Sequence, residues 1–174
     1  MSRDLDAIRQ RLAEESERTV AFFESLPDQA WGQGVYTTGA AWQARQVLAH
    51  LVSAEQAFNR FAGDVLRGRP GAARDFDIDS FNEAEVAALK ARPAAELIEA
   101  FHRTRADTLA LAASLAESDL ARPGFHPWFG DTRLGEMLQL VFRHAMIHQR
   151  DVRRALARAA PLPHRPVTPP HAEA

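Results

Sequence analysis

Four long stretches of helical periodicity restrict the fold of this chain. Apolar side chains recur every three or four residues in the ranges 3–26, 42–67, 93–117 and 132–158. That spacing puts the apolar residues on one face of a helix, and such a face has to be buried against other helices. The pattern therefore predicts an all-α protein built as a four-helix bundle. The first stripe consists of Leu5, Ile8, Leu12, Thr19, Phe23 and Leu26.

The connections between these stretches indicate how the helices are ordered. Residues 27–41 and 118–131 suit links between antiparallel neighbours, whereas 68–92 is the longest connection and its pattern predicts a short helix at Asn82–Ala91. A crossover of that length can return the chain to the end where it started, so that the second and third helices run parallel. We expect one up-down-down-up domain over residues 1–159. Residues 160–174 contain five prolines and are expected to form an extended or disordered tail.

Three of the seven histidines share features that favour a metal site. His144 and His148 are four residues apart in the last helix, so they lie on one face and one turn apart. Val141 and Ala145 place them on or beside the buried stripe of that helix. An i, i+4 histidine pair is a weak signal by itself, because chance produces such pairs often.

His50 is the natural third ligand. It lies about eight residues into the second helix, or ~12 Å along it, and His148 lies about ten residues, or ~15 Å, from the end of the last helix. If these two helices are antiparallel, the two histidines are at similar heights. The alternative interpretation is that His50, His144 and His148 are independent core or boundary residues, each with its own hydrogen bond.

Two sequence segments resemble the DinB/YfiT-like superfamily. The first is Ala41–Leu51, which contains Trp42 and His50, and the second runs from Thr132 through Leu134-Gly135-Glu136 to His144 and His148. The resemblance implies an up-down-down-up bundle, commonly a homodimer, in which the three histidines match a triad that binds zinc, nickel or a similar divalent ion. Its relatives include thiol-dependent S-transferases and mycothiol-dependent maleylpyruvate isomerases. In those isomerases the ligand at the position of His144 is typically a glutamate.

The proposed donor set suggests several functions. Three neutral imidazoles leave the ion at least one open position, where the pKa of a water falls to about 7 and a thiol is deprotonated. The chain has no cysteine, so a thiolate has to come from a low-molecular-weight cosubstrate. A metal-dependent thiol S-transferase acting on a small molecule is the first hypothesis. A metal-dependent hydrolase, and a non-catalytic binding or dimerisation module braced by the metal, are the alternatives.

Two carboxylates are candidates for catalysis. Asp151 lies one turn after His148 and could orient its imidazole, although a surface ion pair with Arg150 or Arg154 is an equally simple role. Glu55 follows His50 by five residues. It could be an extra ligand or a general base, or a solvated or interfacial glutamate.

Other aromatic and histidine residues are open to two interpretations. His102 lies near the edge of its helical stripe and could approach the metal cavity. The aromatic run Phe125–Gly130 could line a substrate pocket or plug the end of the bundle. Trp31 and Trp42 are expected to pack near a helix start.

Charge and hydropathy exclude some partners. The formal net charge of −2 gives no reason to expect nucleic acid or an anionic membrane as the partner. No apolar run approaches the ~20 residues that span a bilayer. Residues 2–10 are charged and polar, unlike a signal peptide, so we expect a cytoplasmic protein.

Overall fold

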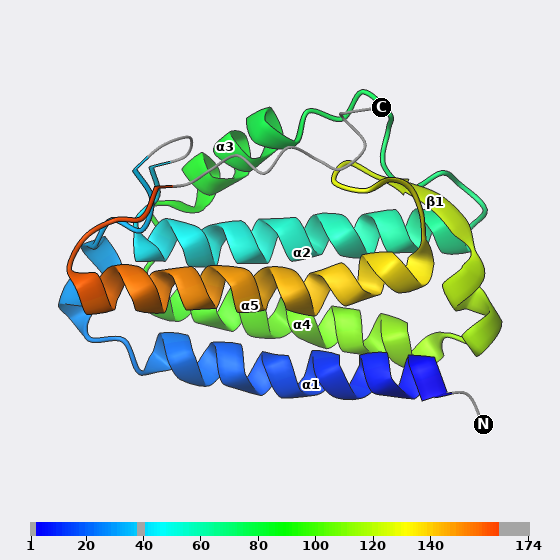
Figure 1. Cartoon of the computed structure of the whole chain (residues 1–174), viewed down its shortest axis with the longest axis horizontal. Coiled ribbons are helices and arrows are strands. Elements are labelled where there is room, and N and C mark those ends of the chain that lie inside the picture. Colours follow the sequence, from blue (N-terminus) through cyan, green and yellow to red (C-terminus); the bar gives the residue numbers. More distant parts are fainter. Residues whose placement is uncertain (1–2, 38–40, 164–174) are drawn as a thin grey trace.

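The chain forms a bundle of four long helices (Figure 1). The computed structural model describes residues 3–37 and 41–163. The bundle helices begin and end within three residues of the predicted stretches, and α1 and α5 run opposite to α2 and α4, which confirms the all-α, up-down-down-up prediction. Their bounds are α1 (Arg3–Glu24), α2 (Ala44–Leu66), α4 (Ala94–Ser114) and α5 (Leu134–Arg158).

Each bundle helix packs against two others. α1 and α2 both contact α4 and α5, so α1 lies diagonally across from α2. The predicted apolar stripes fill the space between them, and Leu12, Phe23, Leu97 and Leu134 are almost completely buried. α2 and α5 are therefore antiparallel neighbours. Within the part of the chain that is described, every helix is too short or too polar to cross a membrane.

The long crossover carries the short helix α3 (Ile78–Leu89), which packs on α2. The sequence predicted this helix at Asn82–Ala91, so it begins four residues earlier than expected. Asp77 explains the early start, because its Oδ1 accepts hydrogen bonds from the backbone N–H groups of Asp79 and Ser80 at 3.1 and 3.0 Å. An aspartate in this position satisfies amides at the helix start that otherwise have no partner.

The connection before α5 contains a hairpin that the sequence did not predict. Strands β1 (Pro123–His126) and β2 (Gly130–Arg133) pair antiparallel, after the short 3₁₀ helix η2 (Glu117–Ala121). Phe125 is buried against Phe61 and Ala57 of α2, so this part of the aromatic run acts as a plug. Strands of four residues are too short to show the alternation by which a strand is recognised in sequence.

The segment after α5 folds back onto the link between α1 and α2. Leu162 is buried, its N–H donates to Val35 O at 2.7 Å, and its carbonyl accepts from Thr37 N at 2.9 Å. The first residues of the predicted tail therefore belong to the domain. The remainder of that tail, residues 164–174, lies outside the described residues. The same link contains the 3₁₀ helix η1 (Asp28–Gly32), whose Trp31 stacks on Phe23 with ring centroids 5.8 Å apart.

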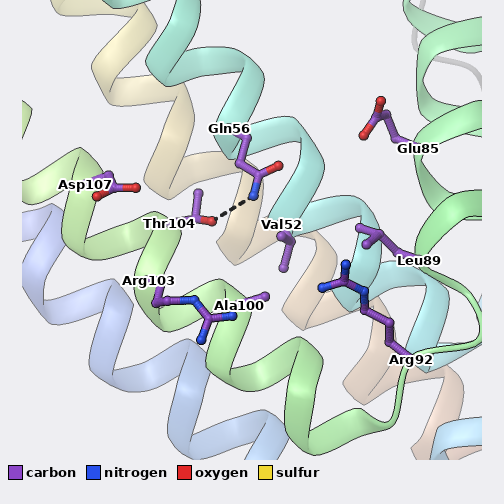
Figure 2. A pocket seen from close by; sticks show the side chains of 9 residues that line it. All are labelled: Val52, Gln56, Glu85, Leu89, Arg92, Ala100, Arg103, Thr104 and Asp107. Carbon is purple, nitrogen blue, oxygen red and sulfur yellow. Dashed lines mark hydrogen bonds between the residues drawn. The ribbon is translucent and has the colours of Figure 1, made fainter.

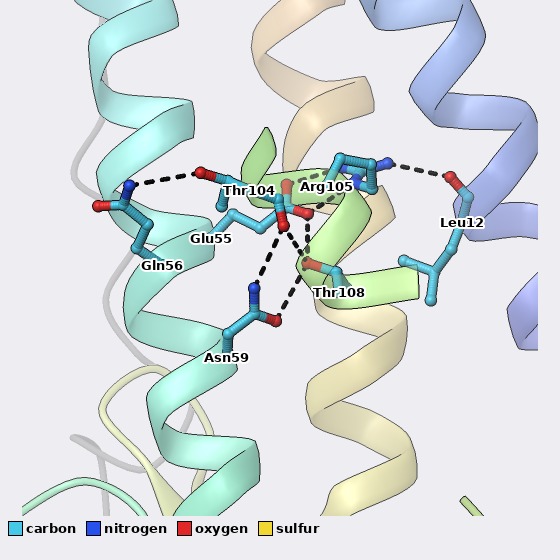
Figure 3. A network of polar contacts seen from close by, with 7 residues as sticks. All are labelled: Leu12, Glu55, Gln56, Asn59, Thr104, Arg105 and Thr108. Carbon is cyan, nitrogen blue, oxygen red and sulfur yellow. Dashed lines mark hydrogen bonds and ion pairs between the residues drawn. The ribbon is translucent and has the colours of Figure 1, made fainter. Parts of the chain in front are cut away.

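A buried ion pair joins three helices (Figure 3). Arg105 of α4 donates to both carboxylate oxygens of Glu55 in α2, at 2.6 and 2.9 Å, and its Nη1 donates to Leu12 O of α1 at 3.1 Å. Thr108 Oγ1 also donates to Glu55, at 2.6 Å. Both charged side chains are almost fully buried. A buried charge is tolerated only when its partners are in place, so these bonds fix the register of α2 against α4.

Breaking this ion pair is expected to destabilise the bundle strongly. Glu55→Ala leaves the guanidinium of Arg105 buried without its counter-charge, which costs about 3–5 kcal/mol of unfolding free energy. The matched control is Glu99→Ala. Glu99 pairs with Arg103 on the exposed face of α4, the helix that carries Arg105. The control is expected to lose less than about 1 kcal/mol. Urea denaturation followed by circular dichroism measures both, and equal losses would contradict the structural role of Glu55.

Candidate metal centre

Three imidazoles from two helices meet inside the bundle. His50 lies on α2, and His144 and His148 lie one turn apart on α5. His144 Nε2 is 3.0 Å from His50 Nε2 and 3.1 Å from His148 Nε2, and one nitrogen from each ring lies within 4.8 Å of the others. The antiparallel packing of α2 and α5 thus brings together the three histidines that the sequence singled out.

The separations between these nitrogens fit ligands of one ion. Two nitrogens that bind the same ion at about 2.0–2.1 Å lie roughly 2.8–3.4 Å apart, for bond angles between square and tetrahedral. Hydrogen bonds alone explain the cluster poorly. His144 Nε2 has either one proton or one in-plane lone pair, yet two ring nitrogens lie at hydrogen-bond distance from it. A shared cation would accept all three lone pairs.

The surroundings of the cluster are aromatic and largely dry. Trp42, just before α2, packs against His50 with ring centroids 4.7 Å apart. The ring centroids of Phe58 and His144 are 5.7 Å apart. His50 and His148 are buried, whereas His144 retains partial exposure. Burial first, and the neighbouring His148 second, hold the pKa of His144 well below its usual value. The ring is therefore neutral near pH 7, and the neutral ring is the form that binds a metal ion.

Tyr36 is the residue of the site that the sequence reasoning missed. Its hydroxyl lies 2.8 Å from His148 Nδ1 and donates to Asp151 Oδ2 at 3.2 Å. Burial, and then the charge of Asp151, raise the pKa of Tyr36, so the hydroxyl keeps its proton at neutral pH. Tyr36 is the only tyrosine of the chain, and it lies in a glycine-containing link. Helical periodicity, which placed the three histidines, gives no information about a residue in a link.

Asp151 has contacts on both sides, with Tyr36 and with Arg150. Its Oδ2 accepts from the Tyr36 hydroxyl, which also contacts His148 Nδ1. Its Oδ1 accepts from the guanidinium of Arg150 at 3.1 Å. Asp151 is thus part of the surroundings of the cluster, although Tyr36 stands between its carboxylate and the imidazole.

The match to known proteins decides the family. A sequence model of the DinB superfamily matches residues 11–152, which is most of the chain. The chain belongs to the DinB superfamily. This agrees with the resemblance of residues 41–51 and 132–148. No curated protein sequence matches the chain.

The DinB bundle of this chain is similar to solved structures of low sequence identity. The mycothiol-dependent maleylpyruvate isomerase has a TM-score of 0.74 and 12% identity over 87% of this chain, which spans only 63% of the isomerase. YfiT from Bacillus subtilis, described as "a probable metal-dependent hydrolase with an unusual four-helix bundle topology", has a TM-score of 0.73 and 19% identity, covering 91% of this chain and 90% of YfiT. The sibling lethal factor precursor DfsB has a TM-score of 0.72 and 14% identity, covering 93% and 100%. At these identities the likeness shows the fold alone.

Two other candidate residues of this DinB chain do not reach the cluster. Glu55 follows His50 by five residues, which turns it about 140° around α2 and towards α4. Its carboxylate is engaged there by Arg105 and Thr108, so the structure replaces the suggested ligand or general-base role with a structural one. His102 is exposed on α4. It lies beside Phe23 and other residues at the C-terminal end of α1.

The hairpin contributes to the aromatic wall of the site. His126 in β1 is buried, with its ring centroid 5.1 Å from Phe58, which in turn contacts His144. Its Nδ1 accepts a hydrogen bond from Trp128 N at 3.1 Å. The structure thus shows the aromatic run as a plug, because Phe125 packs against α2 and His126 packs against Phe58, whereas the lining of a substrate pocket stays a prediction.

A separate hollow opens on another side of α2 (Figure 2). It has a volume of about 330 Å³, and residues of α2, α3 and α4 line it. Val52 and Gln56 form its α2 wall, and they lie about 160° and 120° around the helix from His50. The hollow and the triad therefore lie on different sides of α2.

Proposed function

We propose that this chain binds one divalent metal ion, zinc or nickel, through His50, His144 and His148. The observation that carries the proposal is the meeting of three Nε2 atoms at separations of 3.0 and 3.1 Å. Neutral nitrogen donors suit both zinc and nickel. Buried imidazoles already pointing at one another need little rearrangement to accept an ion.

We further propose that the site is catalytic. Among residues 3–37 and 41–163, the cluster contains no fourth histidine, aspartate or glutamate, and the chain has no cysteine. Three protein ligands and an open position distinguish catalytic sites from closed structural ones. His144 is the least buried of the three histidines. A closed site, in which the ion only braces α2 against α5, is the non-catalytic alternative.

The reaction that we favour is transfer of a low-molecular-weight thiol to a small electrophile. When bound, the ion would supply Lewis-acid activation of a thiol or of a water molecule. The thiol has to come from a cosubstrate, because the chain contains no cysteine. Burial keeps the imidazole of His144 neutral. Trp42 and Phe58 pack against His50 and His144. Support for a thiol comes from the similar fold of the mycothiol-dependent isomerase.

Hydrolysis is the second candidate. The observation that favours it is the match to YfiT, which extends over nearly the full length of both chains, whereas the match to the isomerase leaves more than a third of that enzyme without a counterpart. The same three histidines would serve either reaction. The homodimer and the cytoplasmic location expected from the sequence stay predictions.

Metal content tests the binding proposal directly. Protein purified without chelators is expected to contain about one divalent ion per chain, and His148→Ala is expected to contain little, because two imidazoles seldom suffice to hold such an ion. His102→Ala is the matched control, since it removes an exposed histidine of α4 that is not part of the cluster. Elemental analysis by mass spectrometry gives the ratios. Equal metal content in wild type and His148→Ala would overturn the proposed site.

Activity tests then separate the two reactions. Metal-loaded protein is incubated with epoxide, halide and unsaturated-acid electrophiles, with and without mycothiol, glutathione or cysteine, and in parallel with ester and amide substrates alone. Thioether products that require both thiol and metal would support transfer. Turnover without any thiol would support hydrolysis. In both cases His148→Ala is expected to fall to background while His102→Ala keeps wild-type rates, and absence of turnover in both panels would favour the bracing role.

A further inference from the structure

The Tyr36 hydroxyl occupies a position where one proton decides the state of His148. A tyrosine hydroxyl has a single proton, and an ionised carboxylate can only accept. Tyr36 donates that proton to Asp151 Oδ2 at 3.2 Å. The 2.8 Å contact between Tyr36 Oη and His148 Nδ1 must then be donated by the ring. A ring that donates this contact has its proton on Nδ1.

A proton on Nδ1 leaves the lone pair of the ring on Nε2. That nitrogen is the one that faces His144 Nε2 at 3.1 Å, inside the cluster. We propose that Tyr36 is a positioning residue, which holds His148 in the Nδ1–H tautomer and aims its Nε2 lone pair at the point shared with His50 and His144. This inference rests on the proposed metal site for its purpose, but the tautomer itself is a property of the metal-free protein.

The backbone around Tyr36 is held from two directions. Val35 N donates to Trp42 O at 2.8 Å, which ties the segment to the residues just before α2. Leu162 N donates to Val35 O at 2.7 Å and Thr37 N donates to Leu162 O at 2.9 Å, which ties it to the residues after α5. Residues just before α2 and just after α5 thus both hold the extended segment that carries the hydroxyl.

This arrangement also links Asp151 to the imidazole through the Tyr36 hydroxyl. Asp151 lies one helical turn after His148 on α5, and the buried Tyr36 side chain is inserted between them. The other oxygen of Asp151 accepts from the guanidinium of Arg150 at 3.1 Å, so each carboxylate oxygen has a donor. Groups that orient a metal-binding histidine in this way typically change metal affinity 10–100-fold when removed.

The tautomer is measured first, on metal-free protein labelled with ¹⁵N-histidine. Long-range ¹H–¹⁵N correlation spectra distinguish a protonated Nδ1 from a protonated Nε2, and His148→Gln identifies the signals of residue 148. Wild type is expected to show His148 protonated on Nδ1. Tyr36→Phe removes only the hydroxyl and is expected to raise the fraction protonated on Nε2. A wild-type His148 protonated mainly on Nε2 would overturn the inference.

The matched control is Thr37→Val. It removes the neighbouring hydroxyl, which bonds to Leu162 O rather than to the cluster, and is expected to leave the tautomer unchanged. Asp151→Leu gives an independent variant in case Tyr36→Phe does not fold. Without the carboxylate, the Tyr36 hydroxyl can donate to Nδ1 instead, which again favours protonation on Nε2. An unchanged His148 tautomer in both Tyr36→Phe and Asp151→Leu would contradict the role of Tyr36.

Metal affinity is the second readout, obtained by competition of zinc or nickel with a chromophoric chelator. Tyr36→Phe is expected to bind about 10–100-fold more weakly than wild type, and Thr37→Val within about twofold of it. If wild type binds no metal while its spectra show the expected Nδ1–H tautomer, the proposed function fails and the assignment to Tyr36 stands. Equal affinities of wild type and Tyr36→Phe, with wild type binding tightly, would overturn the positioning role alone.

Discussion

The antiparallel contact between α2 and α5 is the constraint on which the candidate site depends. His50 lies about 9 Å from the start of α2 and His148 about 15 Å from the end of α5, at 1.5 Å per residue. With the helices antiparallel, a small offset brings the two rings to one level. With the helices parallel, His148 would lie about 21 Å from the matching end of α5, too far along the bundle to share an ion with His50. The long crossover through α3 makes the antiparallel contact possible, because it lets α2 and α4 run in the same direction.

α2 is the helix around which the polar interior is organised. It contacts α4, α5 and α3, and charged or imidazole side chains are buried on two of its sides. His50 faces α5, and Glu55 faces Arg105 of α4 (Figure 3). Each of these contacts requires its partner in one place, whereas apolar side chains tolerate small shifts. The ion pair therefore fixes the helix that presents His50, and it does so from the side that the triad does not use.

The parts of the structure that follow from helical geometry could be predicted from sequence. The four helices, their order and the meeting of His50 with His144 and His148 follow from a period of 3.6 residues and a rise of 1.5 Å. The parts that depend on a partner distant in sequence could not be predicted. Glu55 looks like many helical glutamates until Arg105, fifty residues away, is placed beside it. Tyr36 gains its position from backbone bonds to Trp42 and Leu162, and no periodicity in a link reveals such bonds.

The identity of residue 144 bears on what the site can do. In the thiol-dependent isomerases that the sequence resembles, the residue at this position is typically a glutamate. Its negative charge would offset part of the charge of a divalent ion. His144 is neutral near pH 7, because burial and the adjacent His148 keep its pKa low. A donor set of three imidazoles leaves the full charge of the ion to act on whatever occupies the open position. This charge would lower the pKa of a bound thiol or water further than a set with one carboxylate would. His144 is also the least buried of the three histidines, so the residue that distinguishes this chain from those isomerases is the member of the triad nearest the surface.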